Sequence, residues 1–139
     1  VAARIPKDIS IAVEFRHKSW YHEDVYELLR DIGWSFVMTH NEDVGESPFV
    51  VTNSKFLYVR LHGAVSRFVG DYGPVLMKRW AEVVTDFVTQ DATRHVYFFL
   101  NNNESEINGL TSSVVDATYL AQQISLVMKS KASTGTITQ

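Results

Sequence analysis

The 139-residue sequence contains no cysteine. This absence excludes a disulfide framework, thiolate metal sites and cysteine nucleophiles, and it fits a reducing compartment. Long hydrophobic runs are also missing. The apolar runs fall far short of the roughly 20 residues that a membrane helix needs, and the opening VAARIPKDIS has no signal-peptide core. We therefore expect a cytoplasmic or otherwise intracellular protein that does not contact a membrane.

A surplus of positive charge is absent as well. Lys and Arg total 13 against 16 Asp and Glu, a net charge of −3, so no global basic field attracts nucleic acid. The sequence has no G-x-G-x-x-G, G-x-x-x-x-G-K or G-x-S-x-G motif, so dinucleotide, nucleoside-triphosphate and serine-hydrolase functions have no support. An anion site must be local, and nucleic acid is an unfavoured partner that composition alone does not exclude.

The chain does carry enough apolar material for one core. Its length and 45% hydrophobic content predict a single α/β domain over residues 1–130, followed by a flexible tail over 131–139. Trp20, Trp80 and Phe87 are expected in the core. Hydrophobic periodicity predicts strands at 9–16, 34–40, 56–63 and 95–103, the last buried on both sides, and helices at 22–33, 73–88 and 113–129.

This alternation of strands and helices predicts parallel β/α units, with the helices packed outside the sheet. The gap between the second and third strands is too short for a full helix and its loops. Residues 41–54 are therefore expected to form a loop, with room for one short helical turn.

The segment FLYVRLHG, residues 56–63, has two chemically different faces. Alternate side chains of a strand point the same way, so Tyr58, Arg60 and His62 share one face while apolar residues line the other. The arginine and the histidine come at the carboxyl end of the strand. This end is therefore predicted to form part of a polar site.

Polar side chains also end the other predicted strands. The carboxyl ends of parallel strands lie on one side of a sheet, so residues far apart in the sequence are expected to converge there. The converging residues are Glu14, Arg16, Thr39, His40, Arg60, His62, Asn101 and Asn102. This convergence predicts one shared site, with His62 and Glu14 catalytic and with Arg16, Arg60, Asn101, Asn102 and His40 contacting the substrate.

Most of these assignments have a structural alternative. Glu14 and Arg16 form either an ion pair that closes a strand end or a direct substrate contact. His62 either caps the turn at Gly63 or transfers protons near neutral pH, and the pairing with Arg60 favours the second. Asn101 and its neighbour are slightly better explained as loop residues, although an amide can also hold a substrate hydroxyl.

Metal binding is only weakly indicated. His40, His62 and Glu14 are suitable ligand types, but no close H-x-x-x-H motif places two of them on one face. We therefore predict no metal and no cofactor.

Several separated motifs resemble the domain of unknown function 72 family, also called YecE-like. The matching segments are AVEFRHKSW, YVRLHG, FVGDY with RWA, and VYFFLNN, and together they span residues 11–121. The resemblance implies the carboxyl-terminal half of a TIM (β/α)8 barrel, a fold of about 250 residues. In such a barrel Arg60, His62, Gly63, Arg67 and Asn101 would surround a phosphate position.

The sequence departs from the family pattern at three positions. His40 stands near the place of an aspartate, Leu100 stands for a phenylalanine, and Asp116 stands for an asparagine after an enlarged ESEINGLTSS loop. These departures bear on activity more than on fold.

The leading hypothesis is a hydrolase acting on a small anionic or phosphorylated substrate. Arg60 would bind the anion, His62 would act as general acid or base, and Glu14 would be held by Arg16. The alternatives are a nucleic-acid-binding or repair protein and an inactive binding module. Because a half-barrel leaves its sheet edges open, we also expect either a homo-oligomer or an amino-terminal segment to complete the barrel.

Overall fold

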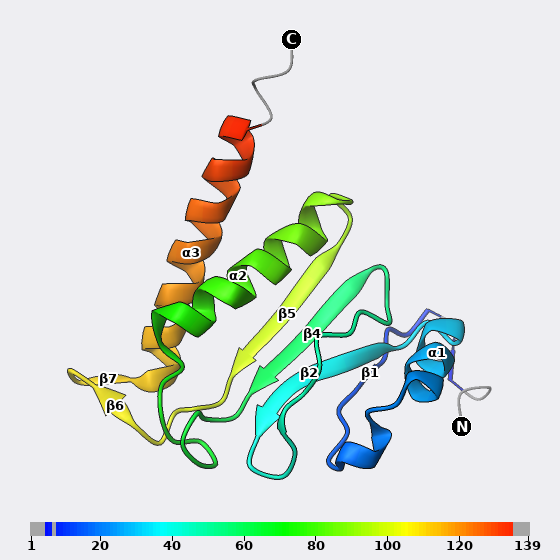
Figure 1. The fold of residues 1–139 in the computed structure, drawn as a ribbon, viewed down its shortest axis with the longest axis horizontal. Helices are drawn as coiled ribbons and strands as arrows, with labels where there is room; N and C mark the ends of the chain where they lie inside the picture. The colour runs from blue at the N-terminus through cyan, green and yellow to red at the C-terminus, as the bar shows by residue number, and fades with distance from the viewer. Residues whose placement is uncertain (1–4, 7, 135–139) are drawn as a thin grey trace.

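The computed structural model describes residues 5–6 and 8–134 and centres on a parallel sheet (Figure 1). Within these residues the strand order across the sheet is β1-β2-β4-β5, so each parallel strand lies beside the next one in the chain. A short strand, β3 (Gly45–Glu46), pairs antiparallel with β2. The parallel strands are β1 (Ala12–Val13), β2 (Ser35–Asn41), β4 (Phe56–Leu61) and β5 (His95–Leu100).

Three α-helices cover one face of the sheet. The core between helices and sheet contains Leu57, Val59 and Leu61 of β4, which lie on the predicted apolar face of that strand. Trp80 and Phe87 also lie in this core, as predicted. The helices are α1 (Glu23–Asp31), α2 (Gly73–Thr89) and α3 (Ser112–Thr134), with a short 3-10 turn η2 (Lys18–Trp20) before α1.

The enlarged loop before α3 forms a hairpin of β6 (Glu106–Ile107) and β7 (Leu110–Thr111). Asn108 and Gly109 both have positive φ, at 52° and 79°. This pair of residues suits the tight turn that matches the twist of a two-stranded hairpin. The Asn-Gly pair was a signal for this hairpin that the sequence analysis missed.

The parallel α/β architecture is confirmed, but several element predictions were wrong. The first strand is only two residues long. Residues 41–54 form the expected loop, with a turn at 42–44 and the short strand β3 and without a helix. The third helix runs to Thr134, so residues 131–134 of the predicted tail are helical. Residues 135–139 lie outside the described residues.

Burial was also mispredicted at two places. Strand β5 is an edge strand whose side chains alternate in exposure, with Tyr97 and Phe99 49% and 43% exposed, because no described layer covers that face. Trp20 is 50% exposed. Its ring stacks on Phe15 at 5.0 Å, since it lies in the short turn η2 and not on a long helical face.

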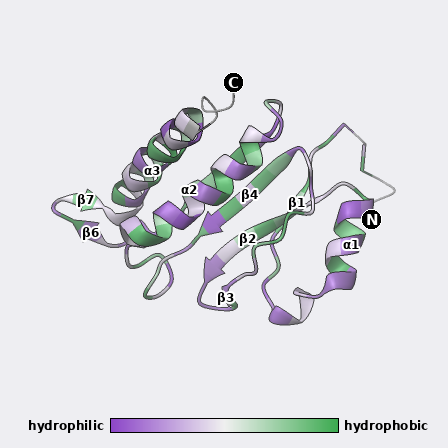
Figure 2. Ribbon diagram, turned by 45° about the horizontal axis from the view of Figure 1, so that its top comes forward, coloured by the Kyte–Doolittle hydropathy of each residue, from purple (hydrophilic) through white to green (hydrophobic). Residues whose placement is uncertain are grey.

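Polarity changes along the strands in the way that the predicted site requires. Figure 2 shows β2 and β4 coloured hydrophobic along their length and hydrophilic at their arrowheads, which are their carboxyl ends.

Among the described helices, none is both long enough and apolar enough to cross a membrane.

Candidate functional site

Glu14 is the centre of a polar cluster at the carboxyl ends of β1, β2 and β4. Its Oε2 atom accepts a hydrogen bond from Arg60 Nη1 at 2.6 Å, and its Oε1 atom lies 3.2 Å from His62 Nε2. Thr39 Oγ1 donates to the same Oε1 atom at 3.3 Å. Side chains separated by up to 48 residues in the sequence therefore meet on one carboxylate, as the parallel sheet predicted.

The cluster is largely shielded from water. The side chain of Glu14 is 10% exposed and that of His62 is 6% exposed. Burial lowers the pKa of His62 below its ordinary value of 6.5, and the nearby Glu14 carboxylate only partly offsets this effect. A neutral imidazole that donates from Nε2 to the carboxylate keeps its lone pair on Nδ1. His62 is therefore set up as a proton acceptor near neutral pH.

A cavity of about 180 Å³ opens beside this cluster. Three guanidinium groups line it, those of Arg16, Arg60 and Arg67. Arg16 also lies 3.4 Å from Glu14 Oε1 and 3.8 Å from Asp43 Oδ2, so the predicted pair with Glu14 forms and extends to a second carboxylate. The cavity is further lined by Asn41, Glu42, Asp43, His62, Phe68 and Asn101.

Asn101 is placed as predicted, at the end of β5 and on the wall of this cavity. Its Oδ1 atom is buried and accepts no hydrogen bond from any described residue. Buried polar atoms are usually paired, so this unpaired oxygen is an exception, which it shares with Asn102 Oδ1.

Asn102, which was also predicted to contact substrate, is not among the residues that line this cavity. Its side chain is fully buried, and its Nδ2 group donates to Asp116 Oδ2 at 2.7 Å and to the carbonyl of Gly70 at 3.0 Å. Adjacent residues at a strand end point in opposite directions, so Asn101 faces the cavity while Asn102 faces the helices. Asn102 holds the loop that precedes α2.

Asp116 is a second buried carboxylate with a structural role. It accepts from the backbone N–H groups of Tyr72 and Gly73 at 2.9 Å each, in addition to Asn102. Tyr72 itself makes no side-chain cap at the start of α2. The aspartate therefore caps α2 from the neighbouring helix, where a negative charge suits the exposed amide groups.

His40 does not join the Glu14 cluster either, so its predicted substrate contact is not supported. Thr39 points toward Glu14, and the next side chain along the strand points to the opposite face. There, His40 Nδ1 lies 2.9 Å from the hydroxyl of Tyr72, which also accepts from Gly63 N–H at 2.9 Å. The Tyr72 hydroxyl therefore joins the end of β2 to the turn at Gly63.

The loop over residues 63–70 forms one wall of the cavity and carries Arg67 and Phe68. It folds back on itself through hydrogen bonds such as Val65 N to Val69 O at 3.1 Å. Gly63 has a φ of 124°, and a Cβ atom there would lie 2.2 Å from the carbonyl oxygen of Ser66. The resemblance covered both residues: it placed Arg67 near the phosphate position, and Phe68 is the first residue of its FVGDY segment.

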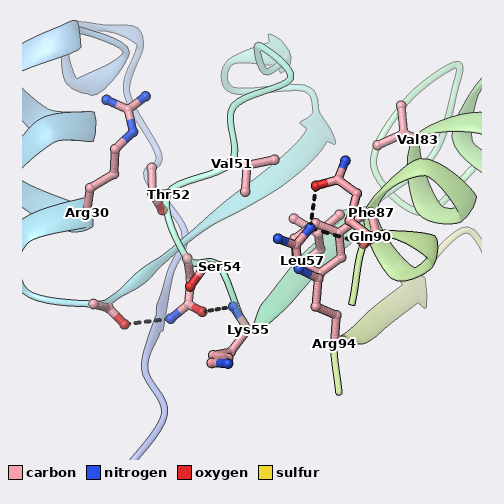
Figure 3. A pocket seen from close by; sticks show the side chains of 12 residues that line it. Arg30, Val51, Thr52, Ser54, Lys55, Leu57, Val83, Phe87, Gln90 and Arg94 are labelled. Carbon is pink, nitrogen blue, oxygen red and sulfur yellow. Dashed lines mark hydrogen bonds between the residues drawn. The ribbon is translucent and has the colours of Figure 1, made fainter. Parts of the chain in front are cut away.

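The largest cavity described lies at the other end of the sheet (Figure 3). It measures about 640 Å³ and is lined by residues of α1, α2 and segment 51–55, including Arg30, Lys55 and Arg94. No acidic side chain lines it, and it contains no candidate acid–base pair. Among the residues described, no three His, Asp or Glu side chains are grouped to hold a metal ion anywhere in the chain.

The chain was compared with known proteins. The sequence model of a family described as protein of unknown function DUF72 matches residues 1–136. A DUF72 family protein of Enterococcus faecalis V583 superposes with a TM-score of 0.69 at 21% identity, covering 86% of this chain and 48% of that one. A DUF72 family protein of Thermotoga maritima MSB8 gives 0.68 at 25% identity, with 85% and 47% covered. None of the curated proteins compared matches the chain. The chain thus spans about half the length of these solved proteins.

Proposed function

We propose, on the premise that this chain belongs to the DUF72 family of proteins of unknown function, that it hydrolyses a small anionic or phosphorylated substrate. The family description contains no reaction, so the proposal rests on the site. The observation that carries it is the Glu14 carboxylate, which binds Arg60 and His62 together at the edge of a cavity lined by guanidinium groups.

Each residue has a distinct role in this proposal. Arg60, Arg16 and Arg67 bind the anionic group, for which guanidinium donors are well suited. His62 is the general base, and Glu14 orients it by accepting a hydrogen bond from its Nε2–H group, as the third member of a catalytic triad does. Asn101 Oδ1 accepts from a hydroxyl or protonated oxygen of the substrate.

For a phosphate ester, the proposed step begins with His62 Nδ1 taking a proton from water. The water oxygen then forms a bond to phosphorus, and the bond from phosphorus to the ester oxygen breaks. The imidazolium returns its proton to the departing oxygen, so the products are an alcohol and phosphate. The arginines stabilise the negative charge that develops on the phosphoryl oxygens.

Turnover of a panel of small phosphate and carboxylate esters by the full chain tests this proposal. The variant His62→Ala should lose about 100-fold to 10,000-fold in rate, the usual contribution of a general base, while its circular dichroism spectrum stays unchanged. The matched control is His95→Ala, because His95 is exposed at the start of β5. Equal rates for the two variants would remove His62 from the mechanism.

The two alternative functions have less support. Nucleic-acid binding usually needs a basic stripe on the surface, whereas Arg16, Arg60 and Arg67 gather around a small cavity in a chain of net charge −3. Phosphate affinity that is independent of His62, without turnover of any ester, would favour the inactive binding module instead.

We also propose that a further polypeptide completes the sheet. The face opposite the helices has a hollow of about 460 Å³, lined by Tyr58, Arg60 and Tyr97 among others, and strands β1 and β5 are both edges. The added strands come from a second copy or from an amino-terminal half. Sedimentation equilibrium of the chain alone distinguishes a dimer from a monomer that awaits another segment.

The proposal also includes an intracellular location and a reaction without a metal or cofactor. The lack of cysteine in all 139 residues agrees with an intracellular, reducing compartment. That no metal and no cofactor takes part stays a prediction, which turnover in the presence of a chelator would test.

A further inference from the structure

Phe68 has a backbone conformation that bulky residues rarely adopt. Its φ is 65°, in the left-handed region where a side chain crowds the backbone. Strain of this kind persists only where the surroundings impose it, and it concentrates at functional sites. Phe68 is also absent from the hydrophobic core of the protein, so core packing does not explain the aromatic side chain.

The surrounding loop holds Phe68 in this conformation from both sides. Its N–H group donates to the carbonyl of His62, and its own carbonyl accepts from the N–H of Glu104 at 2.9 Å. At the end of the loop, Gly70 N–H donates to Ser105 Oγ at 2.9 Å, and a Cβ atom on Gly70 would lie 2.6 Å from Val65 Cγ2. The position of the ring is therefore determined by the fold.

The ring of Phe68 lies at the proposed catalytic site. Its centroid is 6.2 Å from that of His62, and the guanidinium carbon of Arg67 lies 5.0 Å from it. Of the described residues that line the 180 Å³ cavity, Phe68 is the one with an apolar side chain. The cavity lining thus combines three arginines and the carboxylates of Glu42 and Asp43 with one aromatic ring, over which the Arg67 guanidinium lies.

We propose that Phe68 determines substrate specificity by selecting an anion attached to a flat ring, such as an aryl phosphate. An aromatic wall gains contact area and favourable ring geometry against a flat partner, and it gains little against a small alkyl group. The arginines would hold the anionic group while the ring of the substrate lies against Phe68. This inference rests on the proposed function and adds the class of substrate to it.

The test compares two monoesters of equal charge, phenyl phosphate and methyl phosphate, by isothermal titration of the full chain. Ring contacts of this kind correspond to an affinity difference of about twofold to tenfold, so the wild-type protein should prefer phenyl phosphate by that factor. Phe68→Gly should abolish the preference while methyl phosphate affinity changes less than about twofold. Phe99→Ala, which removes an exposed aromatic side chain outside this cavity, should keep the preference.

The stability of the Phe68→Gly variant shows whether Phe68 serves substrate specificity or only the structure of the loop. Glycine adopts a φ of 65° freely, so Phe68→Gly should unfold at the same urea concentration as the wild type or at a higher one. If the Phe68 ring only stabilised the loop, the variant without the ring would unfold at a lower urea concentration than the wild type. If the glycine variant does not fold, Phe68→Asn replaces it in the titrations, because asparagine tolerates this conformation and lacks the ring.

Results that contradict the role of Phe68 differ from results that contradict the proposed function. Equal affinity of the wild type for both esters, or an unchanged preference after loss of the Phe68 ring, overturns the specificity role and leaves the anion site standing. Failure of the wild type to bind or to hydrolyse either ester counts against the proposed function itself.

Discussion

The two ends of the sheet carry similar charges and differ in what those charges do. At the amino end, Arg30 pairs with Glu23 of its own helix at 2.6 Å, and Arg94 bonds the carbonyl of Phe87 and the side chain of Gln90 (Figure 3). At the carboxyl end, side chains from separate strands meet on one carboxylate. The larger cavity, about 640 Å³ against 180 Å³, lies at the amino end.

Helix direction explains the difference. In parallel β/α units the helices run opposite to the strands, so their carboxyl-terminal carbonyl groups gather at the amino end of the sheet. Arginines there satisfy those carbonyl groups, as Arg94 does for Phe87. At the other end, side chains from separate strands bond to one another around Glu14, beside the smaller cavity. The proposed site therefore lies beside the smaller of these two cavities.

The largest expected effect is a loss of stability on replacing Asp116, a buried carboxylate at the carboxyl end of the sheet that lies outside the proposed catalytic cluster. Asp116→Ala leaves two backbone N–H groups and Asn102 without their acceptor. We expect a loss of about 3–5 kcal/mol in the free energy of unfolding, measured by urea denaturation, because each buried donor left unpaired costs about 1–3 kcal/mol. Asp91→Ala, at the exposed amino end, is the matched control. A loss below about 1 kcal/mol for Asp116→Ala would contradict the capping role.

Glu14→Gln should affect chemistry more than folding. The amide keeps the shape but cannot pair as an anion with Arg60 or orient a neutral His62 in the same way, so turnover should fall about 100-fold or more. The amino-end counterpart, Glu23→Gln, breaks the pair with Arg30 and should leave turnover unchanged. Similar losses of turnover in both variants would contradict a catalytic role that is confined to the carboxyl end of the sheet.

The pH dependence should follow His62. Because its pKa in the folded protein lies below 6.5, the unfolded chain takes up a proton in a range where the folded chain does not. The free energy of unfolding should therefore fall as the pH drops below 6.5 and through the folded pKa, by at most about 1.4 kcal/mol per pH unit. Denaturation at several pH values, with His62→Gln as the variant lacking this slope, measures the effect.

The same pKa sets the acidic limit of activity. A general base must be unprotonated, so turnover should decline only below the folded pKa of His62. A titration of the histidine ring protons by NMR, assigned with His62→Gln, gives the pKa directly. A value above 6.5 would contradict the effect of burial.

The smallest effect is expected at the amino end. Arg94→Gln removes the bond to the Phe87 carbonyl and the contact of the guanidinium with the Phe87 ring at 4.6 Å. We expect a loss of about 1 kcal/mol in stability and no change in phosphate affinity by isothermal titration. A clear loss of phosphate binding would move the anion site to the 640 Å³ cavity.

Some features of the site could be predicted because they depend on strand geometry alone. The period of two along residues 56–63 placed Arg60 and His62 on one face and the core residues on the other, and the structure confirms this. The same reasoning did not show that His40 and Asn102 lie away from the cavity lining. Adjacent residues of a strand point to opposite faces. A shift of one residue in the strand register therefore reverses which of the two points to the cavity.

The sequence by itself determined the α/β class, the family and the polar ends of the strands, because these follow from local periodicity and from residues in ordered motifs. Only the tertiary structure decided which polar residues act together. Glu14 and His62 meet through the register of three strands, and Asp116 reaches α2 through the packing of α3. Such contacts depend on distances in space between residues that are far apart in the chain, and one sequence does not contain those distances.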